Sequence, residues 1–446
     1  MSPFNLTVRL LIGYSLLQVM APFSYAVPLS LYSLGVLLSY ISMFLIGLMV
    51  PEFMATGAPR DAMAAPVYSR STIAALTGVA ILLAVVASAG ISLRVADLLL
   101  FRADQFGDAS GSQQSRIASL ELAKGSSGTS AGAFSALAAF LSAFAIFGLV
   151  FFRHFRSILP KWLAVYLLCI SPFSVFEGLA VRGGVFNLAF FGIFAIANLW
   201  GDQALRRAAF TRFAFNKPLM ISVAVGFLLL GGSLFRQRIE IMAGSVDNYQ
   251  VLQQGSALVI FPHWMLELAR DPVSGAIFFP LQWITDYTMQ SLIEFSYTAE
   301  HFYEPYQANG LVQFSLVARG ITALTGLTID PVGDIFPRVG KYGTFFSEVY
   351  MDFGIVGGMI ELFIFGIAAS LVYRASQAGK ATGLILLPLV MTSIAVAPLV
   401  NILASSRIYF ILAGLMLVWP LSGALAEATR PRTRAPVRAA SSARVS

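Results

Sequence analysis

The chain alternates between long apolar runs and short connections that are polar or contain glycine and proline. About 20 apolar residues are enough for a helix to cross the hydrocarbon core of a bilayer. Runs of this kind predict spans near residues 7–25, 29–50, 72–91, 131–152, 161–179, 183–200, 218–235, 346–373, 382–399 and 403–423. The pattern therefore predicts an all-α polytopic membrane protein with about ten transmembrane helices.

Composition excludes a soluble protein. Apolar residues make up 57% of the 446 residues, charged residues only 11%, and the mean hydropathy is +0.78. The single cysteine, Cys169, excludes an internal disulfide and a cysteine-based metal site. Redox and zinc–thiolate chemistry are therefore excluded. We predict no metal and no cofactor.

The distribution of charge predicts the orientation in the membrane. With both termini in the cytoplasm, the inner segments hold 17 of the 29 basic residues but only 4 of the 22 acidic residues. An excess of lysine and arginine on the cytoplasmic side is the usual determinant of orientation. The net charge of +7 is explained in this way and requires no nucleic acid as a partner.

This orientation leaves one very long segment outside, and it divides the chain into four parts. They are the N-terminal membrane helices (1–235), a large extracytoplasmic loop (236–345), the C-terminal membrane helices (346–425) and a disordered basic cytoplasmic tail (426–446). A loop of this length is usually functional or disordered, and this one is too apolar for disorder. We expect short interfacial helices at 251–261, 277–284 and 311–327, or a further pair of spans. A second outer segment, 92–130, has the composition of a polar flap.

The most informative acids lie where the predicted span 346–373 begins. Glu348 and Asp352 are four residues apart and share one helical face. Asp352 would lie about 9 Å inside the helix, where an acid is costly unless it is paired or functional. The alternative is an ordinary residue near the helix end whose side chain reaches the membrane surface. Gly354 and Gly358 share a face with Glu361, so we expect another helix to pack closely there and Glu361 to be a structural acid.

The basic candidates lie at the outer mouth of the membrane and in the large loop. Arg182 follows Glu177 and precedes two glycines, so it either binds an anionic headgroup or closes a tight turn by a salt bridge. The loop adds further candidates for binding phosphate and for accepting a proton. These residues are Arg270, Arg319, Arg338 and Lys341 for phosphate, and Glu300 and His301 for the proton, with ordinary surface ion pairing as the alternative. We interpret the aromatic residues Tyr297, Phe302, Tyr303 and Tyr306 as the core of the loop, with stacking on the rings of a bound sugar as the alternative.

Several catalytic motifs are missing. The sequence contains no GxxxxGK[ST], no HExxH and no GxSxG. ATP-driven transport, zinc-dependent proteolysis and α/β-hydrolase chemistry therefore lack support.

The run from Lys341 to Met359 resembles the late signature of bacterial oligosaccharide repeat-unit polymerases of the Wzy type. The pattern T-x-F-x-x-x-Y-x-D-F-G-x-x-G is met by Thr344, Phe346, Tyr350, Asp352, Phe353, Gly354 and Gly357. The number of spans, the long outer loop before the last three spans and the arginine at an outer mouth are also similar to that family.

The resemblance implies a GT-C-like glycosyltransferase in the bacterial inner membrane that needs no metal. It would polymerise oligosaccharide repeat units linked to undecaprenyl pyrophosphate into a surface polysaccharide such as O-antigen or exopolysaccharide. The resemblance implies that Glu348 or Asp352 is the general base, with His301 and Glu300 as the next candidates. The pyrophosphate would be bound by Arg182, Arg319 and Arg338, with Arg270 and Lys341 as further candidates. The implied partners are the lipid-linked glycans, the bilayer, and a chain-length regulator and flippase of the same pathway. The alternatives are an O-antigen ligase and a non-enzymatic flippase or transporter.

Overall fold

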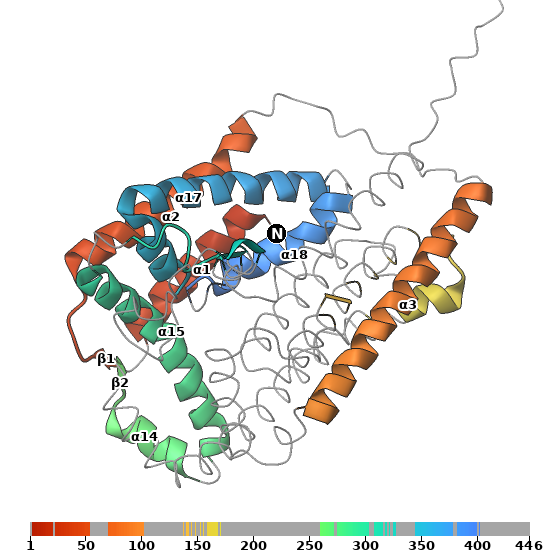
Figure 1. Cartoon of the computed structure of the whole chain (residues 1–446). Coiled ribbons are helices and arrows are strands. Elements are labelled where there is room, and N and C mark those ends of the chain that lie inside the picture. The colour runs from red at the N-terminus through yellow and green to blue at the C-terminus, as the bar shows by residue number, and fades with distance from the viewer. Residues whose placement is uncertain are drawn as a thin grey trace, which may run out of the picture.

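The computed structural model describes residues 2–20, 23–53, 70–101, 259–271, 274–302, 307–314, 344–377 and 381–398, together with shorter pieces between 137 and 170 and between 317 and 326, and residue 401. These residues form helices and one two-stranded sheet (Figure 1). The elements are α1 (Pro3–Met20), β1 (Ser24–Tyr25), α2 (Leu31–Phe53), α3 (Arg70–Phe101), β2 (Val259–Ile260), α14 (His263–Arg270), α15 (Gly275–His301), α17 (Phe345–Gln377) and α18 (Ala381–Val396).

Three helices in the described part of the chain are long and apolar enough to cross a membrane. They are α2, the stretch Ile73–Leu93 within α3, and α17. They coincide with the predicted spans 29–50, 72–91 and 346–373, so the mainly helical fold is confirmed and these three helices are candidates to span a membrane. The predicted spans 183–200, 218–235 and 403–423 and the basic tail lie outside the described residues.

Two predicted boundaries are wrong. The first helix ends at Met20 rather than at residue 25, because Pro22 disfavours helix in the residue before it. Ser24–Tyr25 instead pairs antiparallel with Val259–Ile260. α3 continues to Phe101, ten residues past the predicted end, since 92–101 contains no glycine or proline. The predicted polar flap therefore begins inside a helix.

The described part of the large loop contains a much longer helix than the short interfacial helices that the sequence predicted. α14 is short, with eight residues, but α15 has 27 residues, far beyond the predicted 277–284. Polar side chains hold α15 against the first two helices: Ser291 Oγ lies 2.9 Å from Tyr14 Oη, and Ser33 Oγ donates to Ser296 Oγ at 2.8 Å. The predicted cluster 251–261 ends in β2 rather than in a helix, because its last residues pair with β1.

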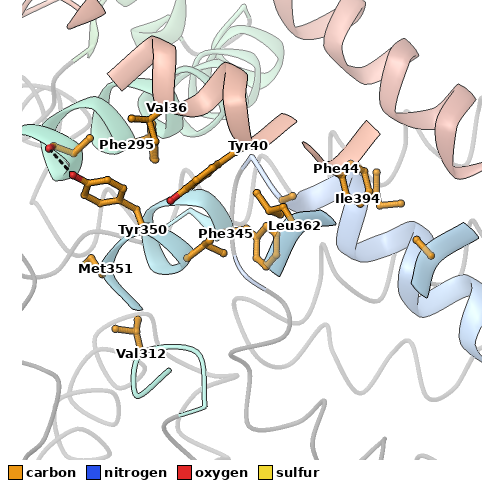
Figure 2. Close-up of a cluster of buried hydrophobic side chains, with 14 of the residues drawn as sticks. Val36, Tyr40, Phe44, Phe295, Val312, Phe345, Tyr350, Met351, Leu362 and Ile394 are labelled. Atoms are coloured by element: carbon orange, nitrogen blue, oxygen red, sulfur yellow. Dashed lines mark hydrogen bonds between the residues drawn. The ribbon is translucent and has the colours of Figure 1, made fainter. Parts of the chain in front are cut away.

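The main core lies between α2 and α17, which run side by side (Figure 1). Tyr32 meets Tyr350 near the start of both helices, and Arg374 donates to the carbonyl of Pro51 near the end of both. In Figure 2, Val36, Tyr40 and Phe44 follow one another across the view in the same direction as Tyr350 and Leu362. The two helices are therefore parallel.

Glycines let these two helices approach closely. A Cβ atom on Gly47 would meet the carbonyl oxygen of Phe363, and one on Gly366 would meet the carbonyl oxygen of Phe44. Gly358 faces the hydroxyl of Tyr40. Small residues at such contacts bring backbones together, so the prediction of a close helix contact is confirmed for Gly358. The predicted shared helical face is wrong for Gly354, because the backbone of that residue is not helical.

Candidate functional site

The site is built around the first turns of α17, which residue Thr344 caps. Its hydroxyl accepts a hydrogen bond from the amide of Ser347 at 3.0 Å, and its carbonyl accepts one from the amide of Glu348 at 3.1 Å. Threonine at this position satisfies donors that the helix itself leaves open. The amide of Phe345 donates to the carbonyl of Ala397 at 3.2 Å, so the same helix start is joined to the chain that follows α18.

α17 is interrupted at Gly354, whose φ and ψ are 62° and −165°. A positive φ of this kind favours glycine. The interruption frees backbone carbonyls, and three of them accept hydrogen bonds from other segments. The carbonyl of Gly354 accepts from Tyr40 Oη at 2.7 Å. The carbonyls of Met351 and Asp352 accept from the amides of Ala308 and Asn309 at 2.9 and 3.0 Å. Inside a membrane such groups must be satisfied by the protein, and the docked segment 307–314 does much of this.

The carboxylate of Asp352 is completely buried, with 0% of its surface exposed. One oxygen accepts from the amide of Val312 and the other from the amide of Gln313, both at 2.9 Å. These amides begin a helical turn in which Phe314 bonds back to Gly310. Asp352 therefore acts as a helix cap supplied from another element, and both of its oxygens already have donors.

Glu348 belongs to a second set of contacts, made with amide side chains. Asn401 Nδ2 donates to Glu348 Oε2 at 2.8 Å and to Gln313 Oε1 at 3.2 Å. Gln313 Nε2 in turn donates to Glu361 Oε2 at 3.2 Å. We call Glu348, Asn401, Gln313 and Glu361 the amide network. It links two acids of α17 through residues that come from two other segments.

In the described part of the chain, no lysine or arginine forms an ion pair with Glu348, Asp352 or Glu361. Their partners are amides of the backbone and of side chains. Glu361 is hydrogen-bonded, as expected, but it is only partly buried, and its partner is Gln313 rather than a residue across the contact with α2. No group of three histidine, cysteine or acidic residues that could hold a metal occurs among the residues searched, which are the described ones.

Two other candidates lie at the end of α15. His301 Nδ1 is 2.9 Å from the carbonyl of Tyr297, and its ring stacks on the ring of Tyr297 with centroids 4.0 Å apart. Both His301 and Glu300 are exposed. The next residue, Phe302, is buried and packs edge-on against Tyr350 at 6.4 Å, which confirms its assignment to the core of the loop.

Arg270 lies at the opposite end of α15 from His301, as the last residue of α14 (Figure 1). A helix of 27 residues is roughly 40 Å long. The structure thus brings Glu348 and Asp352 together but keeps Arg270 far from them. The remaining predicted basic residues and two aromatic residues fall outside the described residues, namely Arg182, Arg319, Arg338, Lys341, Tyr303 and Tyr306.

Gln313 and Asn401 are the polar residues of this site that the sequence reasoning missed. They are 1% and 3% exposed. Each is an isolated amide in an apolar surrounding, without the spacing that marks a motif. The only signal was that a buried amide in such a surrounding needs partners.

Comparisons with known proteins leave the site to be interpreted on its own geometry. No family model matches the chain, and no curated protein and no solved structure is significantly similar to it.

Proposed function

We propose that this protein is a membrane glycosyltransferase that polymerises oligosaccharide repeat units carried on undecaprenyl pyrophosphate. In this reaction the hydroxyl oxygen of the incoming lipid-linked repeat bonds to the anomeric carbon of the growing glycan. The bond from that carbon to the phosphate oxygen of its carrier breaks, and the pyrophosphate leaves with the bonding electrons. The hydroxyl proton passes to a base. The proposal includes a GT-C-like fold of about ten spans in the inner membrane, with both termini cytoplasmic.

The observation that carries the proposal is the concentration of signature residues at one place. Thr344 caps α17, Tyr350 bonds to Tyr32, Asp352 binds the 307–314 segment, and Gly354 interrupts the helix. A signature whose residues only filled lipid-facing surface would not need these contacts. Its residues instead join a segment of the predicted outer loop to the start of a membrane helix, which is where a lipid-linked sugar would meet the protein.

Glu348 is the better of the two predicted bases. Asp352 is fully buried, and both of its oxygens accept backbone hydrogen bonds. Glu348 is only partly buried, and its Oε1 atom makes no hydrogen bond within the described residues. A general base must present an atom to the proton that it removes. We assign the pyrophosphate to Arg182, Arg319 and Arg338, whose guanidinium groups suit phosphate.

The first test is deletion of the gene in its native host, with surface glycan and lipid-linked intermediates resolved by gel electrophoresis and mass spectrometry. We expect long chains to vanish while single repeats persist on the surface or on carriers that face outward. Full-length polymer accumulating on the carrier would identify a ligase instead. Single repeats accumulating on the cytoplasmic face would identify a flippase. Either result would overturn the proposal.

The second test restores the deletion with variants at equal protein level. Glu348→Gln is expected to lower the polymerisation rate about 100-fold or more, the usual contribution of a general base. Arg182→Ala and Arg338→Ala are each expected to lower it by a similar factor, by analogy with the loss of one charge-stabilising donor. Normal chain length in both arginine variants would refute the phosphate assignment.

A further inference from the structure

The amide network has only one consistent arrangement of donors and acceptors. An amide side chain can be turned over, and its partners decide which end is which. Asn401 has an acceptor on each side of its Nδ2 atom, Glu348 Oε2 and Gln313 Oε1. Gln313 must then direct its own Nε2 toward Glu361. The carboxylates at the two ends thus fix both amides.

The network also holds parts of the chain that lie far apart in the sequence. Asn401 is 53 residues from Glu348 and 88 residues from Gln313. The backbone amide of Gln313 is itself held by Asp352 at 2.9 Å. The position of the Glu348 side chain therefore depends on Asn401, that of Asn401 on Gln313, and that of Gln313 on the docking of the 307–314 segment.

The network fixes one oxygen of Glu348 and leaves the other available. Oε2 accepts from Asn401, whereas Oε1 has no hydrogen bond within the described residues. A carboxylate held by one oxygen keeps its orientation while the second oxygen takes up and releases a proton. Reacting groups need this kind of fixed geometry, because small misplacements lower the rate strongly.

We propose that Gln313 and Asn401 are positioning residues that orient the Glu348 carboxylate toward the acceptor hydroxyl. This inference rests on the proposed function, since it assigns how the base of that reaction is held. Neither residue needs to touch the substrate. They act through Glu348, and that dependence separates them from residues that merely support the fold.

The test is a double-mutant cycle measured as the rate of extension of lipid-linked oligosaccharide by the purified full-length protein in lipid nanodiscs. The single variants are Glu348→Gln, Asn401→Leu and Gln313→Met, and each of the last two is also combined with Glu348→Gln. Gln307→Met is the matched control, because Gln307 lies on the same docked segment and is exposed. The melting temperature of every variant is recorded alongside its rate.

We expect Asn401→Leu to lower the rate about 10- to 100-fold, the value of a hydrogen bond to a charged group, and Gln313→Met to lower it about tenfold. In the Glu348→Gln background each should change the remaining rate less than about twofold, because the group through which they act is already lost. Gln307→Met should stay within about twofold of the parent protein.

Two results would overturn the inference, and they can be told apart. If the parent protein extends the glycan but the losses multiply in the Glu348→Gln background, with lower melting temperatures, Gln313 and Asn401 are structural and the proposed function stands. If the parent protein does not extend the glycan, the proposed function fails and the positioning role fails with it.

Discussion

Removal of the Asp352 carboxylate should release the 307–314 segment from α17. Asp352→Ala leaves two buried amides, those of Val312 and Gln313, without their acceptor. Each unsatisfied buried donor costs about 1–3 kcal/mol, so the docked state should lose about 4 kcal/mol. That is close to a thousandfold in the docking equilibrium. Asp352→Asn keeps one acceptor oxygen and should lose about half as much free energy.

Cysteine labelling measures this release directly. The single native cysteine allows a Cys169→Ala background, into which Ala308→Cys is placed as a reporter, because Ala308 is only 4% exposed. Its rate of reaction with maleimide should rise at least about tenfold in Asp352→Ala, since the rate follows the population of the undocked segment. Gln307→Cys, at an exposed neighbour, should react equally fast in every background.

The reasoning would be refuted if Ala308→Cys reacted as slowly with Asp352→Ala as with Asp352 intact, at an unchanged melting temperature. In that case the carboxylate would contribute nothing to the docking, and the buried hydrogen bonds would be incidental.

Three further predictions concern the packing of α2 and α17. Gly47→Leu should lower the melting temperature, by the equivalent of about 2 kcal/mol, because backbone atoms stand where its side chain must go; Gly78→Ala, with open space around it, should not lower it. Gly354→Ala should cost about 1–3 kcal/mol, because its φ of 62° with a ψ of −165° lies in a region that is essentially restricted to glycine, and an unchanged melting temperature would contradict this. Parallel helices require that Ala26→Cys and Gln377→Cys, at opposite ends of the pair, react with impermeant maleimide from opposite sides of the membrane; labelling from the same side would disprove the arrangement.

The long apolar helices could be predicted from the sequence because their signal is local. α2 and α17 lie within about four residues of the predicted 29–50 and 346–373, since composition alone decides whether a segment is stable in lipid. The β1–β2 pair could not be predicted, because its strands have two residues each and are joined across more than half of the chain. Periodicity carries no information about a partner so far away.

The candidate site could also be predicted from the sequence only in part. Glu348 and Asp352 could be singled out because acids are rare and costly in an apolar helix. The different environments of these two acids could not be predicted. The donors to Asp352 are backbone amides, whereas the donor to Glu348 is the side chain of Asn401. Backbone donors have no signature in a sequence, and an asparagine acquires its role only from the residues that the fold places around it.

The pairing of α2 with α17 also determines when the protein can complete its fold during synthesis. α2 is made early, but the helix that covers Tyr40 and Gly47 emerges some 300 residues later. Until then the hydroxyl of Tyr40 lacks the carbonyl of Gly354, to which it donates in the folded protein. A nascent chain that stops before residue 345 therefore lacks more than its last helices: Tyr40 and Gly47 of α2 also lack the surface of α17 that packs on them in the folded protein.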